Sequence, residues 1–190
     1  MMNRVRLSVL AAAAVLSLAG CATGDKAATA VQGAVQAQTT PTLSTTDATF
    51  FDLASRAGIE EVAFGQLARD QAGRQSVKAF AVRMVDEQTA LNQQLTRLAQ
   101  TKGVTPPDTM DTTHTDAFAR LQTLHGRAFD VAYLNGQATD HAATLKLFQN
   151  EAQTGTDPDV KAFAQNTIPT LQMHLDTARR LGGRVMRPAS

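Results

Sequence analysis

The sequence has one cysteine, one tyrosine and no tryptophan among its 190 residues. A single thiol cannot form an intramolecular disulfide, so a folded domain must be stabilised by packing alone. The lack of Trp and Tyr disfavours a stacking platform for bases or sugars, and the eight phenylalanines supply nearly all of the aromatic bulk. Glycan binding is therefore not expected.

The sequence also lacks an excess of one charge, because it contains 18 basic and 17 acidic residues. The basic residues are scattered along the chain, so no field is expected that would attract nucleic acid. The sequence also lacks a serine nucleophile motif, a glycine-rich phosphate loop and the Cys/His spacing of a zinc site. We therefore predict no nucleic-acid partner and no catalytic residues.

The N-terminus has the pattern of an export signal. Arg4 and Arg6 precede an apolar run, Leu7–Leu18, which ends in Leu18-Ala19-Gly20-Cys21. About a dozen apolar residues are too few for a retained membrane-spanning helix, which needs roughly 20. The pattern resembles a bacterial lipoprotein signal, in which residues 1–20 are removed and Cys21 is lipidated. Because Ala22 follows in place of the Asp that commonly retains lipoproteins at the inner membrane, we expect the periplasmic face of the outer membrane.

Residues 21–46 are rich in Ala, Thr, Gln and Gly and have few bulky side chains. Such a segment cannot bury enough apolar surface to offset its ordering, so it predicts a flexible tether. A short amphipathic helix at residues 27–38 is the alternative.

Four segments follow in which apolar residues recur with a helical period, and no segment has the alternation of a strand. Capping and breaking residues place the helices at about Asp47–Gln71, Arg74–Lys102, Thr113–Gly155 and Thr156–Gly182, the third broken near Gly126. With short turns inside each pair, they predict an all-α, up-down-up-down four-helix bundle at residues 47–182 and a tail at 183–190. The phrase Val77–Ala81 recurs as Val160–Ala164, which suggests two related helical hairpins.

Each predicted helix has one large polar residue on its apolar stripe: Glu61, Gln88, His141 and His174. Burial of such groups is costly unless they are hydrogen-bonded, paired or bound to a metal. Counting back from the turn near Thr156 places His174 about one helical turn from His141, so the two imidazoles can meet. Glu61 and Gln88 are offset by more than a turn in the same count.

Two hypotheses explain these residues. In the first, Glu61, His141 and His174 bind a transition metal such as zinc, iron, copper or manganese. In the second, which we favour, they form a polar layer that fixes the helix register, with neutral histidines paired to Glu61, Gln88 or Tyr133 and no cofactor. Glu87, Gln88, Asp130 and Tyr133 are expected near this part of the core.

Three further groups have simpler explanations. The pairs Glu60-Glu61 and Asp86-Glu87 are interpreted as solvated faces with one inward member each. Asp111 and His114 have the spacing of a metal-binding pair, but they precede a predicted helix, where capping and turn formation are expected.

Several phrases of the chain resemble bacterial exported proteins that carry the ferritin-like domain of unknown function 4142. The phrases lie between about Thr49 and Leu181 and are Gly58–Val62, Val77–Ala81, Arg83–Val85, Phe129–Leu134 with His141, Ala162–Ala164, and Pro169–Leu171 with His174. The resemblance implies a ferritin-like four-helix bundle and no established activity. Where that family usually has Met-Val-x-Asp-His, this chain has Met84-Val85-Asp86-Glu87-Gln88, and a neutral amide is a poor metal ligand.

From these observations we expect a non-enzymatic envelope lipoprotein that acts as a binding or structural module. Its expected partners are the membrane, through the lipid on Cys21, and an envelope protein. The alternative is a metal-binding or metal-dependent redox protein that uses the bundle core.

Overall fold

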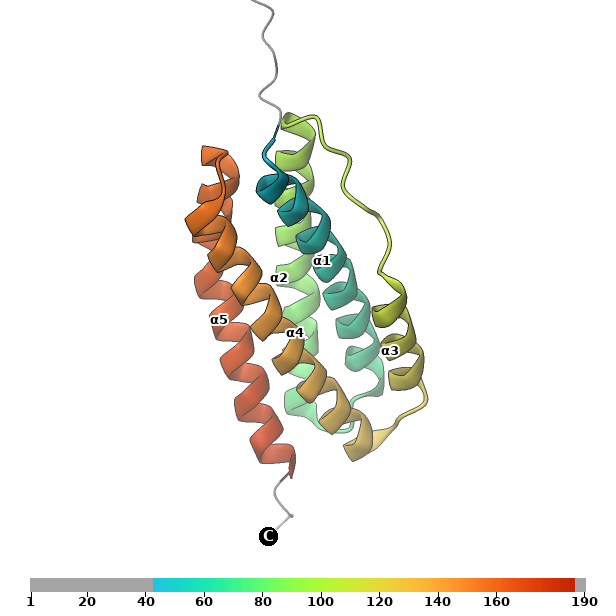
Figure 1. Ribbon diagram of the computed structural model, residues 1–190. Helices are drawn as coiled ribbons and strands as arrows, with labels where there is room; N and C mark the ends of the chain where they lie inside the picture. Colours follow the sequence, from blue (N-terminus) through green and yellow to red (C-terminus); the bar gives the residue numbers. More distant parts are fainter. Residues whose placement is uncertain (1–42, 187–190) are drawn as a thin grey trace, which may run out of the picture. The chain divides into compact units, whose positions relative to one another are not determined.

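The computed structural model describes residues 43–186, with side chains as far as Gly183. The export signal, Cys21 and nearly all of the predicted tether lie outside this range. The described part contains five helices and no strand: α1 (Thr45–Gln71), α2 (Gln75–Thr101), α3 (Thr112–Gln122), α4 (Gly126–Thr154) and α5 (Pro158–Met186). The all-α bundle is confirmed, with α1, α2, α4 and α5 as its four long helices (Figure 1). None of the described helices is long and apolar enough to cross a bilayer.

The direction of α4 differs from the strict alternation that the sequence suggested. Asp130, near the start of α4, contacts the start of α2, and Lys102, just after α2, pairs with Asp157 before α5. Helices α2 and α4 therefore run parallel, and each of them is antiparallel to α1 and α5 (Figure 1). One long crossover must join α2 to α4, which is the connectivity of ferritin-like bundles.

The crossover explains the break near Gly126. The chain descends from the end of α2, forms α3 on the outside of the bundle beside α1, and turns at Thr123–His125 before α4 begins (Figure 1). Gly126 has a φ of 57°, a left-handed conformation that glycine adopts without a Cβ clash. The predicted third helix is thus two antiparallel helices, because the chain reverses at this point.

Two helix ends differ from their predicted positions. Ser44, not Asp47, is the N-cap of α1, and Asp47 is the third helical residue of a capping box with Ser44. At the other end of the domain, α5 continues through Gly182 and Gly183 to Met186. Glycine lowers helix stability by only about 1 kcal/mol, so two glycines need not end a long helix that is packed along its length.

Each end of the bundle is held by one buried carboxylate. Asp47 accepts hydrogen bonds from the backbone N–H groups of Thr156 and Asp157, in the turn between α4 and α5, at 3.0 and 3.3 Å. Asp130 accepts hydrogen bonds from the N–H groups of Gly73 and Arg74, in the turn between α1 and α2, at 2.8 and 3.0 Å. Each hairpin therefore supplies the carboxylate that binds the turn of the other.

These contacts match the repeated phrase in the sequence. Asp47 and Asp130 are 83 residues apart, and so are Gly73 and Thr156, Arg74 and Asp157, and the two copies of the repeated phrase at Val77 and Val160. The same offset in the sequence and in the hydrogen bonds supports the hypothesis of two related hairpins.

The pH dependence of stability tests the contacts at the end of the bundle where Asp47 lies. Glu151 is buried beside Asp47, and burial followed by the charge of Asp47 raises the pKa of Glu151 to about 7. Asp157 raises it further, whereas Lys161 lowers it. An unfolded Glu ionises near 4.5, so the folded chain binds more protons between pH 4.5 and 7, and stability must fall as pH rises through this range.

We therefore expect Glu151→Gln to make this decline shallower and to raise stability at pH 8 by up to about 3 kcal/mol, because a pKa unit corresponds to about 1.4 kcal/mol. Some decline should remain, since burial also raises the pKa of Glu60 and Asp140. Urea unfolding from pH 4.5 to 8 measures the effect. Asp176→Asn, which removes an exposed carboxylate on α5, is the control and should leave the slope through this range in place. A parent chain whose stability is constant across the range would contradict the prediction.

The apolar core has two parts. One cluster lies around the turn between α1 and α2 and includes Phe64, Phe80, Met84, Phe129 and Tyr133. The other lies around the turn between α4 and α5 and includes Phe50, Phe51, Phe148, Val160 and Leu171. Between the two clusters, α1, α2, α4 and α5 each contribute buried polar residues, and these form the first candidate site.

Candidate functional site

The four polar residues of the predicted stripes lie together in the core. Glu61, Gln88, His141 and His174 are at most 5% exposed, and each comes from a different long helix. Counting along the helices had placed Glu61 and Gln88 more than one turn away from the histidines. In the structure both residues nevertheless lie beside His141.

The centre of this polar layer is a pair of imidazoles. Nε2 of His141 lies 3.3 Å from Nδ1 of His174, with the rings nearly perpendicular. Nδ1 of His141 lies 3.0 Å from a carboxylate oxygen of Glu61 and 3.1 Å from the backbone oxygen of Gln137. Gln137 also donates a hydrogen bond of 2.5 Å from its amide to the other oxygen of Glu61.

The layer continues to the surface on the α2 side. Nε2 of His174 lies 2.5 Å from a carboxylate oxygen of Glu87, and Glu87 is paired with Arg83 at 2.7 Å. Glu87 is one-third exposed, so this carboxylate connects the buried histidines with solvent. We call the series Glu61–His141–His174–Glu87 the histidine relay.

The outer nitrogens of the relay define where its protons lie. Nδ1 of His141 and Nε2 of His174 both face oxygen acceptors, so both nitrogens must donate. Two neutral rings would then place two lone pairs against each other at 3.3 Å, and one further proton is needed between them. Burial alone would lower the pKa of His141, but Glu61 outweighs this and raises it; burial lowers the pKa of His174. Of the two rings, His141 is therefore the one that binds this proton more strongly.

The remaining residues expected near this layer have different positions. The amide nitrogen of Gln88 lies 3.5 Å from Nε2 of His141, at the edge of the relay. Tyr133 packs against Phe80 and Phe129, and its buried hydroxyl has no hydrogen-bond partner in the described part of the chain. Asp130 binds the turn between α1 and α2, so its role is structural.

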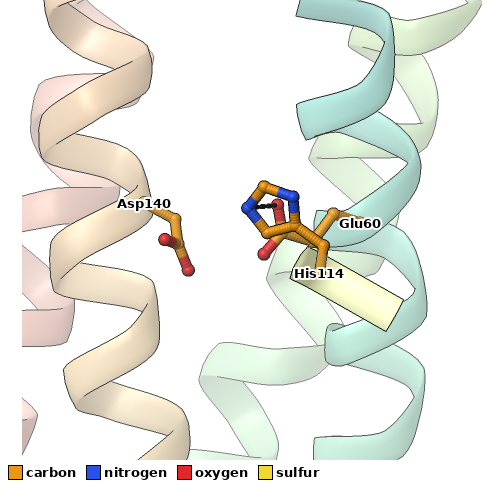
Figure 2. A group of neighbouring side chains, drawn as sticks. All are labelled: Glu60, His114 and Asp140. Carbon is orange, nitrogen blue, oxygen red and sulfur yellow. Dashed lines mark ion pairs between the residues drawn. The ribbon is translucent and has the colours of Figure 1, made fainter. Parts of the chain in front are cut away.

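A second cluster lies on the α3 side of the bundle. Glu60 from α1, His114 from α3 and Asp140 from α4 point toward one another, and their nearest ligand atoms all lie within 4.8 Å (Figure 2). Nε2 of His114 is 3.2 Å from Glu60, and Nδ1 is 2.8 Å from Asp111. We call Glu60, His114 and Asp140 the outer triad.

Negative charge is crowded at the outer triad. Glu60 is only 3% exposed, and burial followed by the charges of Asp140 and Glu61 raises the pKa of Glu60 to about 9. Burial and Glu61 also raise the pKa of Asp140, to about 6. These carboxylates thus hold a proton more strongly than isolated ones, which is the behaviour of a group that lacks a cationic partner.

The outer triad was not expected from the sequence. Glu60 was assigned to a solvated face because adjacent residues on a helix cannot share one stripe, yet both Glu60 and Glu61 are buried. Asp111 does cap α3 as expected, through a 2.9 Å hydrogen bond from the N–H of His114. The sequence does contain a sign of this cluster, namely the two adjacent polar pairs Glu60-Glu61 and Asp140-His141. Glu61 and His141 face the core, whereas Glu60 and Asp140 face His114 of α3.

The fold and these clusters define a four-helix bundle with a ferritin-like crossover and ionisable residues in its interior. A family model described as "Domain of unknown function (DUF4142)" matches residues 32–181, so the chain belongs to this family. The match begins inside the predicted tether. Comparison with curated proteins and with solved structures gave no match.

Proposed function

We propose that this chain is a lipid-anchored protein of the bacterial envelope whose bundle is a non-enzymatic binding or structural module. The sequence Leu18–Cys21 supports the anchor. The hydrogen bonding of the histidine relay supports the module, because its carboxylates and imidazoles bind one another. A protonated pair of this kind fixes the register of four helices and offers no free nucleophile.

The anchor is tested by Cys21→Ser. The variant should leave the membrane fraction or accumulate with its signal uncleaved, because no thiol remains to accept lipid. Cell fractionation and mass spectrometry of the N-terminus measure both outcomes. Normal cleavage with unchanged membrane partitioning would contradict the proposal, and Ser17→Ala, in the apolar run, is the control expected to behave as the parent.

A metal-binding function of the core is the second candidate, and one feature of the relay favours it. Each histidine has a carboxylate on its outer nitrogen, as metal-binding histidines commonly do, and the inner nitrogens are 3.3 Å apart. Two nitrogens on one tetrahedral ion would have a similar separation. The metal would have to replace the proton between His141 and His174.

The two candidates differ in their response to added metal. A core metal site requires the thermal midpoint to rise with zinc, manganese, copper or ferrous iron in the parent and not in His141→Ala. A relay without metal gives no rise that depends on His141. Elemental analysis of protein purified without chelators provides an independent check.

A further inference from the structure

We propose that the outer triad, Glu60, His114 and Asp140, binds a divalent transition-metal ion between α1, α3 and α4. This site is separate from the histidine relay and does not depend on the lipid anchor. Three observations support it: the direction in which the ligand atoms point, the positioning of His114 by Asp111, and access from solvent.

The first observation is the convergence of three metal-binding side chains from three helices (Figure 2). Zinc binds imidazole nitrogen and carboxylate oxygen at about 2.0–2.2 Å, so two ligands of one ion are at most about 4.4 Å apart. The ligand atoms of the outer triad lie within 4.8 Å of one another. Small rotations of His114 and Asp140, which are both partly exposed, would bring them to this distance.

The second observation is the orientation of His114. Asp111 lies 2.8 Å from Nδ1 and holds the ring so that Nε2 faces Glu60. Nε2 is 3.2 Å from a carboxylate oxygen of Glu60, and either a proton or a metal cation can bridge these two atoms. A carboxylate on the outer nitrogen is the usual partner of a metal-binding histidine.

The third observation is access. A surface hollow of about 220 Å³ is lined by Glu60, Asp111, His114 and Asp140, so an ion and its remaining water ligands can enter. Arg56 also lines the hollow, but Asp52 holds its guanidinium at 3.2 Å. The positive charge of Arg56 is therefore already paired, and a cation in the hollow would meet a surplus of carboxylates.

One nitrogen and two oxygen ligands suit borderline ions such as zinc or ferrous iron better than soft or purely oxygen-seeking ions. Binding would also fasten α3, because His114 would join α3 to both neighbouring helices. In α3, Leu121 is the one buried residue, and the ring of Phe118 packs against Phe64 with centroids 5.4 Å apart. The proposed ion would thus stabilise the packing of α3 against α1 and α4.

The experiment uses the untagged full chain in detergent, freed of metal by chelator and titrated with zinc in a calorimeter. We expect one ion per chain, with affinity at least tenfold weaker in His114→Ala, Asp140→Asn and Glu60→Gln. His125→Ala and Asp116→Asn remove an exposed imidazole and an exposed carboxylate outside the triad and should bind as the parent does. Circular dichroism without metal shows that each variant is folded.

A second measurement separates this site from the core. Zinc should slow amide hydrogen exchange of α3 at least several-fold in the parent and in His141→Ala, but not in His114→Ala. An absence of zinc binding by the folded parent would show a His114–Glu60 ion pair only and overturn the proposal. Binding that persists in His114→Ala, or that is lost in His141→Ala, would also overturn it.

Discussion

Asp130→Ala is expected to lower the free energy of unfolding by about 3 to 5 kcal/mol. The side chain is fully buried and its two oxygens accept the N–H groups of Gly73 and Arg74. Hydrogen bonds to charged groups contribute about 1.5–3 kcal/mol each, and their loss leaves buried donors without an acceptor. Urea denaturation of the parent and the variant measures the difference.

Two controls test the assignment. Asp130→Asn retains one acceptor oxygen and should lose less stability than Asp130→Ala. Asp47→Ala removes the equivalent carboxylate at the other end and should have an effect of similar size, because Asp47 binds Thr156 and Asp157 in the same manner. A loss below about 1 kcal/mol in both alanine variants would mean that these carboxylates do not hold the turns.

The second large effect is expected in the histidine relay. Glu61→Ala should lower the free energy of unfolding by about 3 to 5 kcal/mol, because it leaves the imidazolium of His141 buried without its carboxylate. The amide of Gln137 loses its acceptor in the same variant. Chemical denaturation at pH 6, where the relay is protonated, is the measurement.

Glu61→Gln retains an acceptor of similar shape, so it should be less destabilising than Glu61→Ala. A double variant, Glu61→Leu with His141→Leu, should lose less stability than the sum of its single variants, since removal of both members of a buried pair leaves no unpaired charge. Strict additivity would indicate that Glu61 and His141 do not interact.

Local patterns in the sequence predict most of this fold. The apolar stripes locate the long helices, and Pro158 with Asp157 before it fixes the start of α5, because these residues act within one helical turn. Ser44 and Asp47 are both good caps, so the sequence alone does not distinguish between the N-cap and the third residue of a capping box. The reversed direction of α4 depends on the crossover, which carries no periodic signal.

Of the two candidate sites, local patterns in the sequence predict one and not the other. The contact between His141 and His174 follows from the register of one hairpin, since only the short turn between α4 and α5 has to be counted through. The outer triad depends on where α3 lies against α1 and α4, a tertiary arrangement with no counterpart in helical spacing. Glu60 therefore resembles any surface acid until α3 covers it.

The 83-residue offset between the two hairpins has an evolutionary consequence. Two copies of one ancestral hairpin, paired with two-fold symmetry, would each place an Asp at the turn of the partner, as Asp47 and Asp130 do. Duplication and fusion of such a gene would yield this chain, with the segment from Lys102 to His125 as the connection. The positions equivalent to His141 and His174 in the first hairpin are Gly58 and Leu91. The histidines therefore belong to one hairpin alone, so the relay lacks the two-fold symmetry that the carboxylate contacts at the two ends of the bundle have.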